Sequence, residues 1–265
     1  MHFTNTRFAA CIALACAAAV QAGSIPADPL TVRQLEGQLH GFLVLRSPDG
    51  AIIADGDLIQ TTHGSQIHSR LVFHFKDGSL QDETAIFSQR GRFRLLSDHL
   101  IQKGPSFNRA MDVLINAGTG LVTVHSTDDK GKDKTIAEHL DLPPDLANGM
   151  VPILLKNVTP GAQTATYSMV VATPKPVLVK LQISSGGEDQ FSTGGEGRKA
   201  TRYIVKVDLG AVKGAVASLV GKQPPDTFVW ILAGACPVFV RSEGPMYESG
   251  PIWRIEPVSP AWPKK

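Results

Sequence analysis

Apolar residues recur at every second position in many short segments of this chain, and this period limits the fold more than any other feature. In the segment RLVFHF, Leu71, Phe73 and Phe75 alternate with Arg70, Val72 and His74. Successive side chains of a β-strand point to opposite faces, so this order predicts a strand with one apolar and one polar face. The chain is therefore expected to fold mainly as β-sheet.

Short turns separate these segments. Asp77-Gly78 and Arg90-Gly91 favour turns because glycine tolerates positive φ, and residues 117–120 read AGTG. Connections of this length join antiparallel neighbours, since a parallel crossover needs a dozen or more residues. The predicted strands cover residues 39–45, 51–59, 71–75, 79–88, 92–101, 111–116, 121–126, 165–172, 177–185, 199–209, 228–232, 238–241 and 252–255.

A polar and charged segment near residues 127–160 separates two groups of strands. We interpret it as a connector that ends in a short helix at 145–158, interrupted by Gly149 and by Pro152, because proline removes a backbone donor. A second helix is predicted at 210–222, where apolar residues share one side at helical spacing. The predicted fold class is mainly β (β-rich α+β): a curved antiparallel sheet or half-barrel of meandering strands with two or three short helices.

The N-terminus is typical of a secretory signal peptide. An apolar run follows Arg7 and gives way to small residues that end at Ala22. The run is shorter than the about 20 apolar residues of a membrane helix. Residues 1–22 are therefore predicted to be a cleaved signal, and residues 23–265 a single β-rich domain that is periplasmic or secreted. A division of this domain into two parts near 127–160 stays open.

Charge and cysteine content narrow the expected partners. The formal net charge is +2 and no segment carries a dense row of Lys and Arg, so nucleic acid is not an expected partner. After cleavage at Ala22, Cys236 would be the one remaining thiol, and no intramolecular disulfide could form. Its apolar neighbours predict a buried, unreactive thiol. The mature chain is expected to be soluble or in peripheral contact with a membrane.

The polar candidates for a site lie between His68 and His99. His68 and His74 are six residues apart, about 20 Å along a strand, which is too far for shared ligation of one ion. No metal site and no cofactor are predicted. Asp82 and Glu83 are adjacent and should point to opposite faces, with Glu83 beside an arginine of the next strand. His74, Glu83 and His99 form the alternative polar site, which requires two of them to converge within hydrogen-bond reach.

The sequence contains no recognised catalytic motif. Gly-x-Ser-x-Gly, Ser-x-x-Lys and His-Glu-x-x-His are all absent, and the glycine-rich stretch SGGEDQFSTGGEGR lacks the order of a phosphate-binding loop. Asn157-Val158-Thr159 matches a glycosylation sequon, a pattern of three residues that also arises by chance. The chain is therefore not predicted to be an enzyme.

Two stretches resemble known proteins. The segments LVFHFKDGSLQDETAIFSQRGRFRLLSDHLIQKGPSF and LPPDLANGM, behind the predicted signal peptide, resemble a group of uncharacterised exported bacterial proteins over about residues 56–156. The succession of meandering strands with few helices is similar to the antiparallel half-barrel of LolA/LolB-like lipoprotein carriers. The first resemblance implies no known activity. The second implies a curved sheet whose concave apolar face shelters a lipid or acyl chain, with helices as a lid.

These observations lead to one preferred function and two alternatives. The preferred function is a non-enzymatic periplasmic binding or carrier protein for an apolar or lipid-like ligand. Alternation of side chains does not reveal whether the apolar face is filled by core or left open for that ligand. The alternatives are an envelope hydrolase or isomerase that uses the polar site, and a structural protein that binds a partner through an open sheet edge or an exposed apolar patch. The candidate apolar face comprises Leu71, Phe73, Phe75, Phe87, Phe93 and Leu95.

Overall fold

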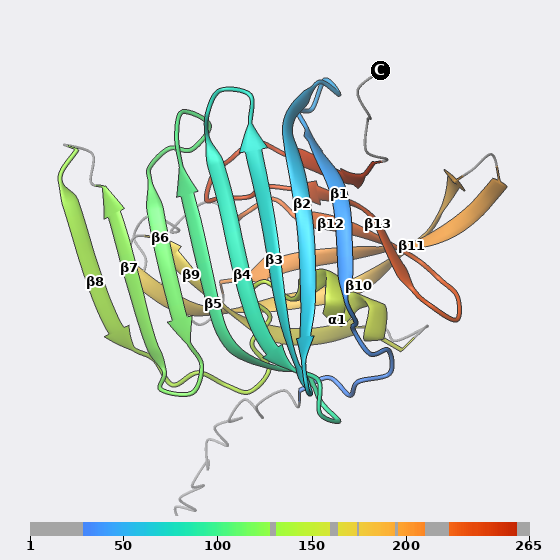
Figure 1. Ribbon diagram of the computed structural model, residues 1–265, viewed down its shortest axis with the longest axis horizontal. Helices are drawn as coiled ribbons and strands as arrows, with labels where there is room; N and C mark the ends of the chain where they lie inside the picture. Colours follow the sequence, from blue (N-terminus) through green and yellow to red (C-terminus); the bar gives the residue numbers. More distant parts are fainter. Residues whose placement is uncertain are drawn as a thin grey trace, which may run out of the picture.

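The alternating segments pair edge to edge into one antiparallel sheet (Figure 1). The computed structural model describes residues 29–127, 131–159, 164–173, 175–193, 196–209 and 223–258, and these residues contain fourteen strands and one helix. The elements are β1 (Leu39–Arg46), β2 (Ile52–His63), β3 (Gln66–Phe75), β4 (Leu80–Ser88), β5 (Arg94–Lys103), β6 (Met111–Asn116), β7 (Leu121–Thr127), β8 (Asp133–His139), α1 (Val151–Asn157), β9 (Thr164–Thr173), β10 (Lys175–Thr193), β11 (Glu196–Asp208), β12 (Thr227–Leu232), β13 (Val238–Gly244) and β14 (Trp253–Pro257).

The strands follow their sequence order on either side of one junction. The order across the sheet is β8-β7-β6-β5-β4-β3-β2-β1-β14-β13-β12-β11-β10-β9. At the junction the first strand pairs with the last, with Leu43 opposite Pro257 and Leu45 opposite Ile255. The strands before the connector and those after it therefore form one continuous sheet.

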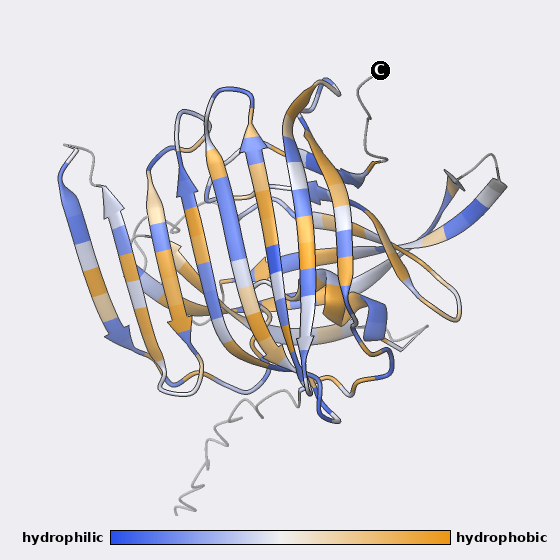
Figure 2. Cartoon of the chain, in the orientation of Figure 1, coloured by the Kyte–Doolittle hydropathy of each residue, from blue (hydrophilic) through white to orange (hydrophobic). Residues whose placement is uncertain are grey.

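Curvature brings two parts of this sheet face to face. In Figure 1, β1 to β8 form a front layer, the strands from β9 to β13 cross behind it, and α1 lies between the layers. Hydropathy alternates along the strands of the front layer (Figure 2), as burial of one face requires. The main core cluster fills the enclosed side and includes Ile67, Ile115, Leu155 and Ile183. The curved, unclosed antiparallel sheet confirms the predicted fold class.

Helix α1 begins differently from the prediction. Gly149 adopts a φ of 64° just before it, and Pro152 lies in its first turn. A proline is tolerated there because its missing N–H has no partner within the helix. Pro152 therefore helps to start the helix and does not interrupt it. The buried side chains of α1 include Ile153, Leu154 and Leu155, which pack into the main core cluster.

Two predicted segments lie outside the described residues. The signal peptide predicted at 1–22 and the helix predicted at 210–222 both fall there completely. No helix in the described part of the chain is long and apolar enough to cross a membrane.

Strand β8 lies in the segment that we interpreted as a connector. Its sequence, DKTIAEH, has no alternation of apolar residues, and its side chains are exposed or half-buried on both faces. It nevertheless pairs with β7 from Thr127 opposite Asp133 to Leu121 opposite His139. Its charged residues suit the edge of a sheet, where they oppose pairing with another chain.

The other end of the sheet is covered by residues 145–148. These residues run parallel to β9, and the N–H of Ala147 donates to the carbonyl of Ser168 at 2.8 Å. The side-chain amide of Asn148 continues the ladder, because it donates to the carbonyl of Val170 and accepts from its N–H, both at 2.9 Å. The edge of β9 is therefore paired by the segment that leads into α1.

Residues 30–36 run along the end of the front layer and reach α1. The N–H of Val32 donates to the carbonyl of Gly91 at 3.0 Å, and the N–H of Phe93 donates to the carbonyl of Leu30 at 2.9 Å. Further on, the N–H of Glu36 donates to the side-chain oxygen of Gln89 at 2.8 Å. An ion pair of 2.5 Å between Glu36 and Lys156 places the polar end of this segment beside the last turn of α1.

Candidate functional site

The predicted apolar face is part of the packed core. Three of its members lie in the main core cluster with side chains of α1, and the other three lie in or against a second cluster around Trp253. The first three are Phe87, Phe93 and Leu95, and the others are Phe73, Phe75 and Leu71. The ring centroids of Phe75 and Trp253 are 5.4 Å apart, so aromatic side chains occupy the space in front of this part of the sheet.

The structure does not bring the three residues of the alternative polar site together. His74 is exposed on the convex face, and His99 is bound there to Asp112, with Nε2 2.9 Å from a carboxylate oxygen. Glu83 lies on the enclosed face. Adjacent Asp82 and Glu83 do point to opposite faces, but Asp82 is the one that meets an arginine, accepting two hydrogen bonds from Arg70 at 2.9 and 2.6 Å.

A bulge in β5 explains why His99 faces away from Glu83. Phe87 of β4 pairs with Leu95, whereas the preceding Ile86 pairs with Ser97, so one extra residue lies in β5. An extra residue exchanges the two faces of the strand beyond it. Strict alternation from Leu95 would place His99 on the enclosed face. The bulge places Asp98 there instead.

Asp98 and Glu83 form a pair of acids on the enclosed face that the sequence analysis missed. Asp98 is 2% exposed, and its Oδ1 has no hydrogen-bond partner among the described residues. Gly149 covers both acids. A Cβ atom built on Gly149 would lie 2.9 Å from Asp98 Oδ1, 3.7 Å from Glu83 Oε1 and 2.6 Å from the Cβ of Ala85. The backbone at residue 149 therefore lies so close to the two acids that only glycine fits there.

The surroundings of this pair favour its protonated forms. Burial raises the pKa of Glu83 to about 7. Burial raises the pKa of Asp98 well above its ordinary value, and the nearby charge of Glu83 raises it further. Desolvation disfavours the charged form of a carboxyl group, and no described basic side chain forms an ion pair with either acid. The pair can hold protons near neutral pH.

A second polar cluster lies where residues 145–148 meet β9. The hydroxyl of Ser168 donates to Asp145 Oδ1 at 2.8 Å, and Lys180 Nζ donates to the same hydroxyl at 2.7 Å. Burial and the charge of Asp145 raise the pKa of Tyr167 to about 12. Ser168 is 0% exposed, so its hydroxyl is closed to a substrate. The cluster fastens the segment before α1 to the edge of the sheet.

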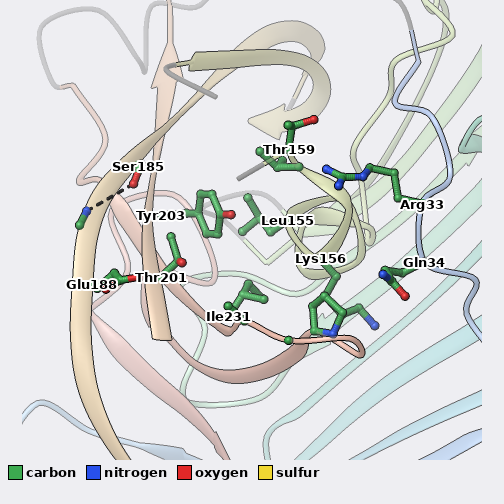
Figure 3. A pocket seen from close by; sticks show the side chains of 15 residues that line it. Arg33, Gln34, Leu155, Lys156, Thr159, Ser185, Glu188, Thr201, Tyr203 and Ile231 are labelled. Carbon is green, nitrogen blue, oxygen red and sulfur yellow. Dashed lines mark hydrogen bonds between the residues drawn. The ribbon is translucent and has the colours of Figure 1, made fainter. Parts of the chain in front are cut away.

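A hollow of about 320 Å³ lies between α1, residues 33–34 and the enclosed face of β10 to β12 (Figure 3). Leu155, Tyr203 and Ile231 form its inner wall, and polar side chains surround them. In Figure 3 the ring of Tyr203 projects into the hollow between Ser185 and Leu155. The polar lining comprises Arg33, Gln34, Lys156, Thr159, Ser185, Glu188 and Thr201.

Asn157 fixes one side of the hollow. It is 0% exposed, and its Oδ1 accepts the N–H groups of Arg33 and Gln34 at 2.8 and 2.7 Å. Its Nδ2 donates to the carbonyl of Ile153 at 3.0 Å. Asn157 therefore holds residues 33–34 against α1, and in this conformation its amide is inaccessible to the glycosylation that its sequon would permit.

Within the part of the chain that the structure describes, one cation on the rim of the hollow has no partner. Lys156 pairs with Glu36 at 2.5 Å, and Lys199 pairs with Glu188 at 3.4 Å. Arg33 is exposed, and no hydrogen bond or ion pair holds its guanidinium within the described part of the chain. Of the three charged lining residues, Lys156 and Glu188 are each paired with an opposite charge. Only the positive charge of Arg33 is left uncompensated among the described residues.

Cys236 lies beside this rim, next to the lining residue Pro237. It is a free cysteine and it is exposed, so the prediction of a buried thiol is wrong. The apolar neighbours that suggested burial belong to a turn between β12 and β13, where Ala233, Gly234 and Ala235 are also exposed. Among the described residues, no group of three or more His, Cys, Asp and Glu side chains could hold a metal ion.

The fold and the hollow define a β-rich protein with a curved, open antiparallel sheet and a small hollow beside its helix. No family model matches the sequence, and no curated protein matches it. The structure is similar to a beta-barrel-like protein of unknown function from Brucella abortus, with 8% identity, a TM-score of 0.44, and coverage of 84% of this chain and 98% of the other. It is also similar to the hypothetical lipoprotein YmcC from Escherichia coli, with 11% identity, a TM-score of 0.37, and coverage of 84% and 85%. Neither is described as a lipoprotein carrier, so that resemblance stays a prediction.

Proposed function

We propose that this chain is a non-enzymatic binding or carrier protein of the cell envelope, and that it holds an apolar or lipid-like ligand in the hollow beside α1. The observation that carries the proposal is the hollow itself, with an inner wall of Leu155, Tyr203 and Ile231. Small-molecule sites are concave, lined mainly by apolar and aromatic side chains, and of about 300–1,000 Å³. A hollow of 320 Å³ lies at the lower end of that range.

The distribution of the core supports this position for the ligand. The six apolar residues selected from the sequence pack against other side chains, including α1 and Trp253. A ligand would have to displace well-packed core at those positions, at a cost of several kcal/mol. The hollow beside α1 can accept a ligand without that displacement.

The predicted signal peptide would deliver the protein to the envelope, where lipid-like molecules are available. Peripheral contact with a membrane would then allow loading and release. A ligand with an apolar chain has low solubility in water, because each buried CH₂ group contributes about 0.8 kcal/mol to its transfer out of water. A protein that encloses such a chain would lower the barrier to its movement between surfaces.

A hydrolase or isomerase built on His74, Glu83 and His99 has less support. General acid–base catalysis requires the participating groups to converge on one substrate. The two histidines lie on the convex face and Glu83 on the enclosed face, so no single substrate can contact all three. The remaining acid pair is covered by Gly149.

Native mass spectrometry of protein purified from its own envelope tests the proposal. We expect wild-type protein to carry an additional small-molecule mass. Thr201 lines the hollow, and Thr201→Trp should fill it and remove that mass. The control is Thr84→Trp, which places the same ring on the convex face of β4. An apo mass for the wild type, or an equal bound mass in both folded variants, would refute the proposal.

A further inference from the structure

The proposed function leaves the chemistry of the ligand open, and the rim of the hollow narrows it. We infer that the hollow binds a single-chain amphiphile with one anionic head group, and that Arg33 binds this group. The inference rests on the proposed function. It combines the size of the hollow, the nature of its inner wall and the charge that remains uncompensated at its rim.

The size of the hollow limits the apolar part of the ligand. A volume of 320 Å³ is small for a ligand site, since such sites reach about 1,000 Å³. Lipids with two or three acyl chains need the upper part of that range or more. One chain of moderate length, in contact with Leu155 and Ile231, matches the space and the apolar wall.

The charges around the rim select the head group. Lys156 and Glu188 line the hollow, but each already has a partner of opposite charge, Glu36 and Lys199 respectively. Arg33 lines the same hollow without such a partner in the described part of the chain. A cationic head group would meet uncompensated repulsion from Arg33, and a neutral one would gain no ion pair. An anionic group gains a charge-assisted hydrogen bond.

The backbone of Arg33 is held in place for this role. Asn157 Oδ1 accepts the N–H groups of Arg33 and Gln34, which fixes the backbone of both residues on α1. A planar guanidinium can donate two parallel hydrogen bonds to a carboxylate or a phosphate, whereas the ammonium of lysine acts as a point charge. The structure thus supplies a fixed backbone and an exposed guanidinium donor at a hollow that has apolar residues in its inner wall.

Isothermal titration calorimetry with four probes of equal chain length tests the inference: decanoate, decyl phosphate, decanol and decyltrimethylammonium, each below its micellar concentration. We expect decanoate and decyl phosphate to bind wild-type protein about tenfold more tightly than decanol, because only the anionic head groups can accept charge-assisted hydrogen bonds from the Arg33 guanidinium. The cationic probe should bind most weakly. A preference between the two anions would distinguish carboxylate from phosphate as the natural head group.

Substitution of Arg33 assigns the preference to this residue. Arg33→Ala should weaken decanoate about tenfold and leave decanol unchanged, and Arg33→Lys should lie between them. Arg90→Ala is the control, because Arg90 is an exposed arginine in the turn between β4 and β5. Equal binding of decanol and decanoate, or an effect of Arg90→Ala as large as that of Arg33→Ala, would overturn the inference and leave the proposed function standing. Absence of binding by all four probes would count against the proposed function itself.

Discussion

The enclosed side of the sheet is closed over β4 and β5 and open beside β10 to β12. Over the first region the backbone at Gly149 lies so near Asp98 and Ala85 that a Cβ atom does not fit. In the second region α1 and the sheet leave a hollow of 320 Å³. Residues 145–159 contribute to both, because the segment before α1 covers the acids and the helix itself borders the hollow.

The two regions also differ in charge. Among the described residues, the two carboxyl groups of the closed region have no basic partner, and Arg33 of the open region has no acidic one. An unpaired buried charge opposes folding, whereas an unpaired exposed charge at a cavity is available to a ligand. The closed region should therefore determine stability and its pH dependence, and the open region should determine binding.

Gly149→Ala should have the largest effect on the closed region. The new methyl group would meet Ala85 and Asp98 at less than 3 Å, at a residue whose φ is 64°. We expect the free energy of unfolding to fall by about 3 kcal/mol, from backbone strain and overpacking together. Urea denaturation monitored by circular dichroism measures it.

Gly64→Ala is the matched control for that substitution. Gly64 has a φ of 63°, but a Cβ atom there would meet nothing within 4 Å. The loss should be about 1 kcal/mol, because only the backbone strain is shared. Equal losses of unfolding free energy in the two variants would show that the close contact of Gly149 with the acids adds no strain. The closed region would then be less tightly packed than the structure indicates.

Asn157→Ala should have the next largest effect, on the border of the open region. The substitution leaves the N–H groups of Arg33 and Gln34 without their acceptor. We expect a loss of about 2 kcal/mol in the free energy of unfolding, and weaker binding of decanoate because Arg33 loses its fixed backbone. Asn116→Ala is the control: Asn116 Oδ1 also accepts two backbone N–H groups, but in an exposed turn, and about 1 kcal/mol is expected. A smaller loss for Asn157→Ala than for this control would contradict the prediction.

The sequence predicts the strands well because their signal is local. Alternation in LVFHF and turns at Asp77-Gly78 and Arg90-Gly91 are contained within a few residues, and β3, β4 and β5 follow them. The exception is β8, whose side chains are exposed or half-buried on both faces and whose sequence therefore carries no alternation of apolar residues. Its pairing depends on β7 and on the position at the sheet edge.

The candidate site depends on contacts that no local pattern records. Glu83 was identified as a polar candidate, but its actual neighbour is Asp98, which a one-residue bulge in β5 turns inward. The hollow combines Arg33, Leu155, Tyr203 and Ile231 from four separate parts of the chain. Asn157 carried a signal in the sequence, the sequon, but that signal pointed to modification and not to its buried hydrogen bonds.

Glu83→Gln should have the smallest effect of the three, and its sign depends on pH. Because the pKa of Glu83 in the folded protein is about 7, above its ordinary value of 4.5, the folded state retains a proton that the unfolded state releases. This contribution to stability is complete below pH 4.5 and is lost as the pH rises to about 7. Wild-type protein should therefore be more stable at pH 5 than at pH 8. Because Glu83 is partly exposed, solvent screens its charge. We therefore expect its ionisation to change the free energy of unfolding by about 1–2 kcal/mol, less than its full pKa shift corresponds to.

The amide of Glu83→Gln cannot ionise, so the variant should lose part of this pH dependence. At pH 8 it should unfold at a higher urea concentration than the wild type, and at pH 5 the two should nearly coincide. Loss of the Glu83 charge also removes one of the two causes that raise the pKa of Asp98, which adds to the change in the same direction. Glu248→Gln, in the loop between β13 and β14, is the control and should preserve the wild-type dependence. The opposite result is a free energy of unfolding that differs between pH 5 and pH 8 by the same amount in Glu83→Gln as in the wild type. That result would show that the acids of the closed region are not the source of the pH dependence, and would contradict the prediction.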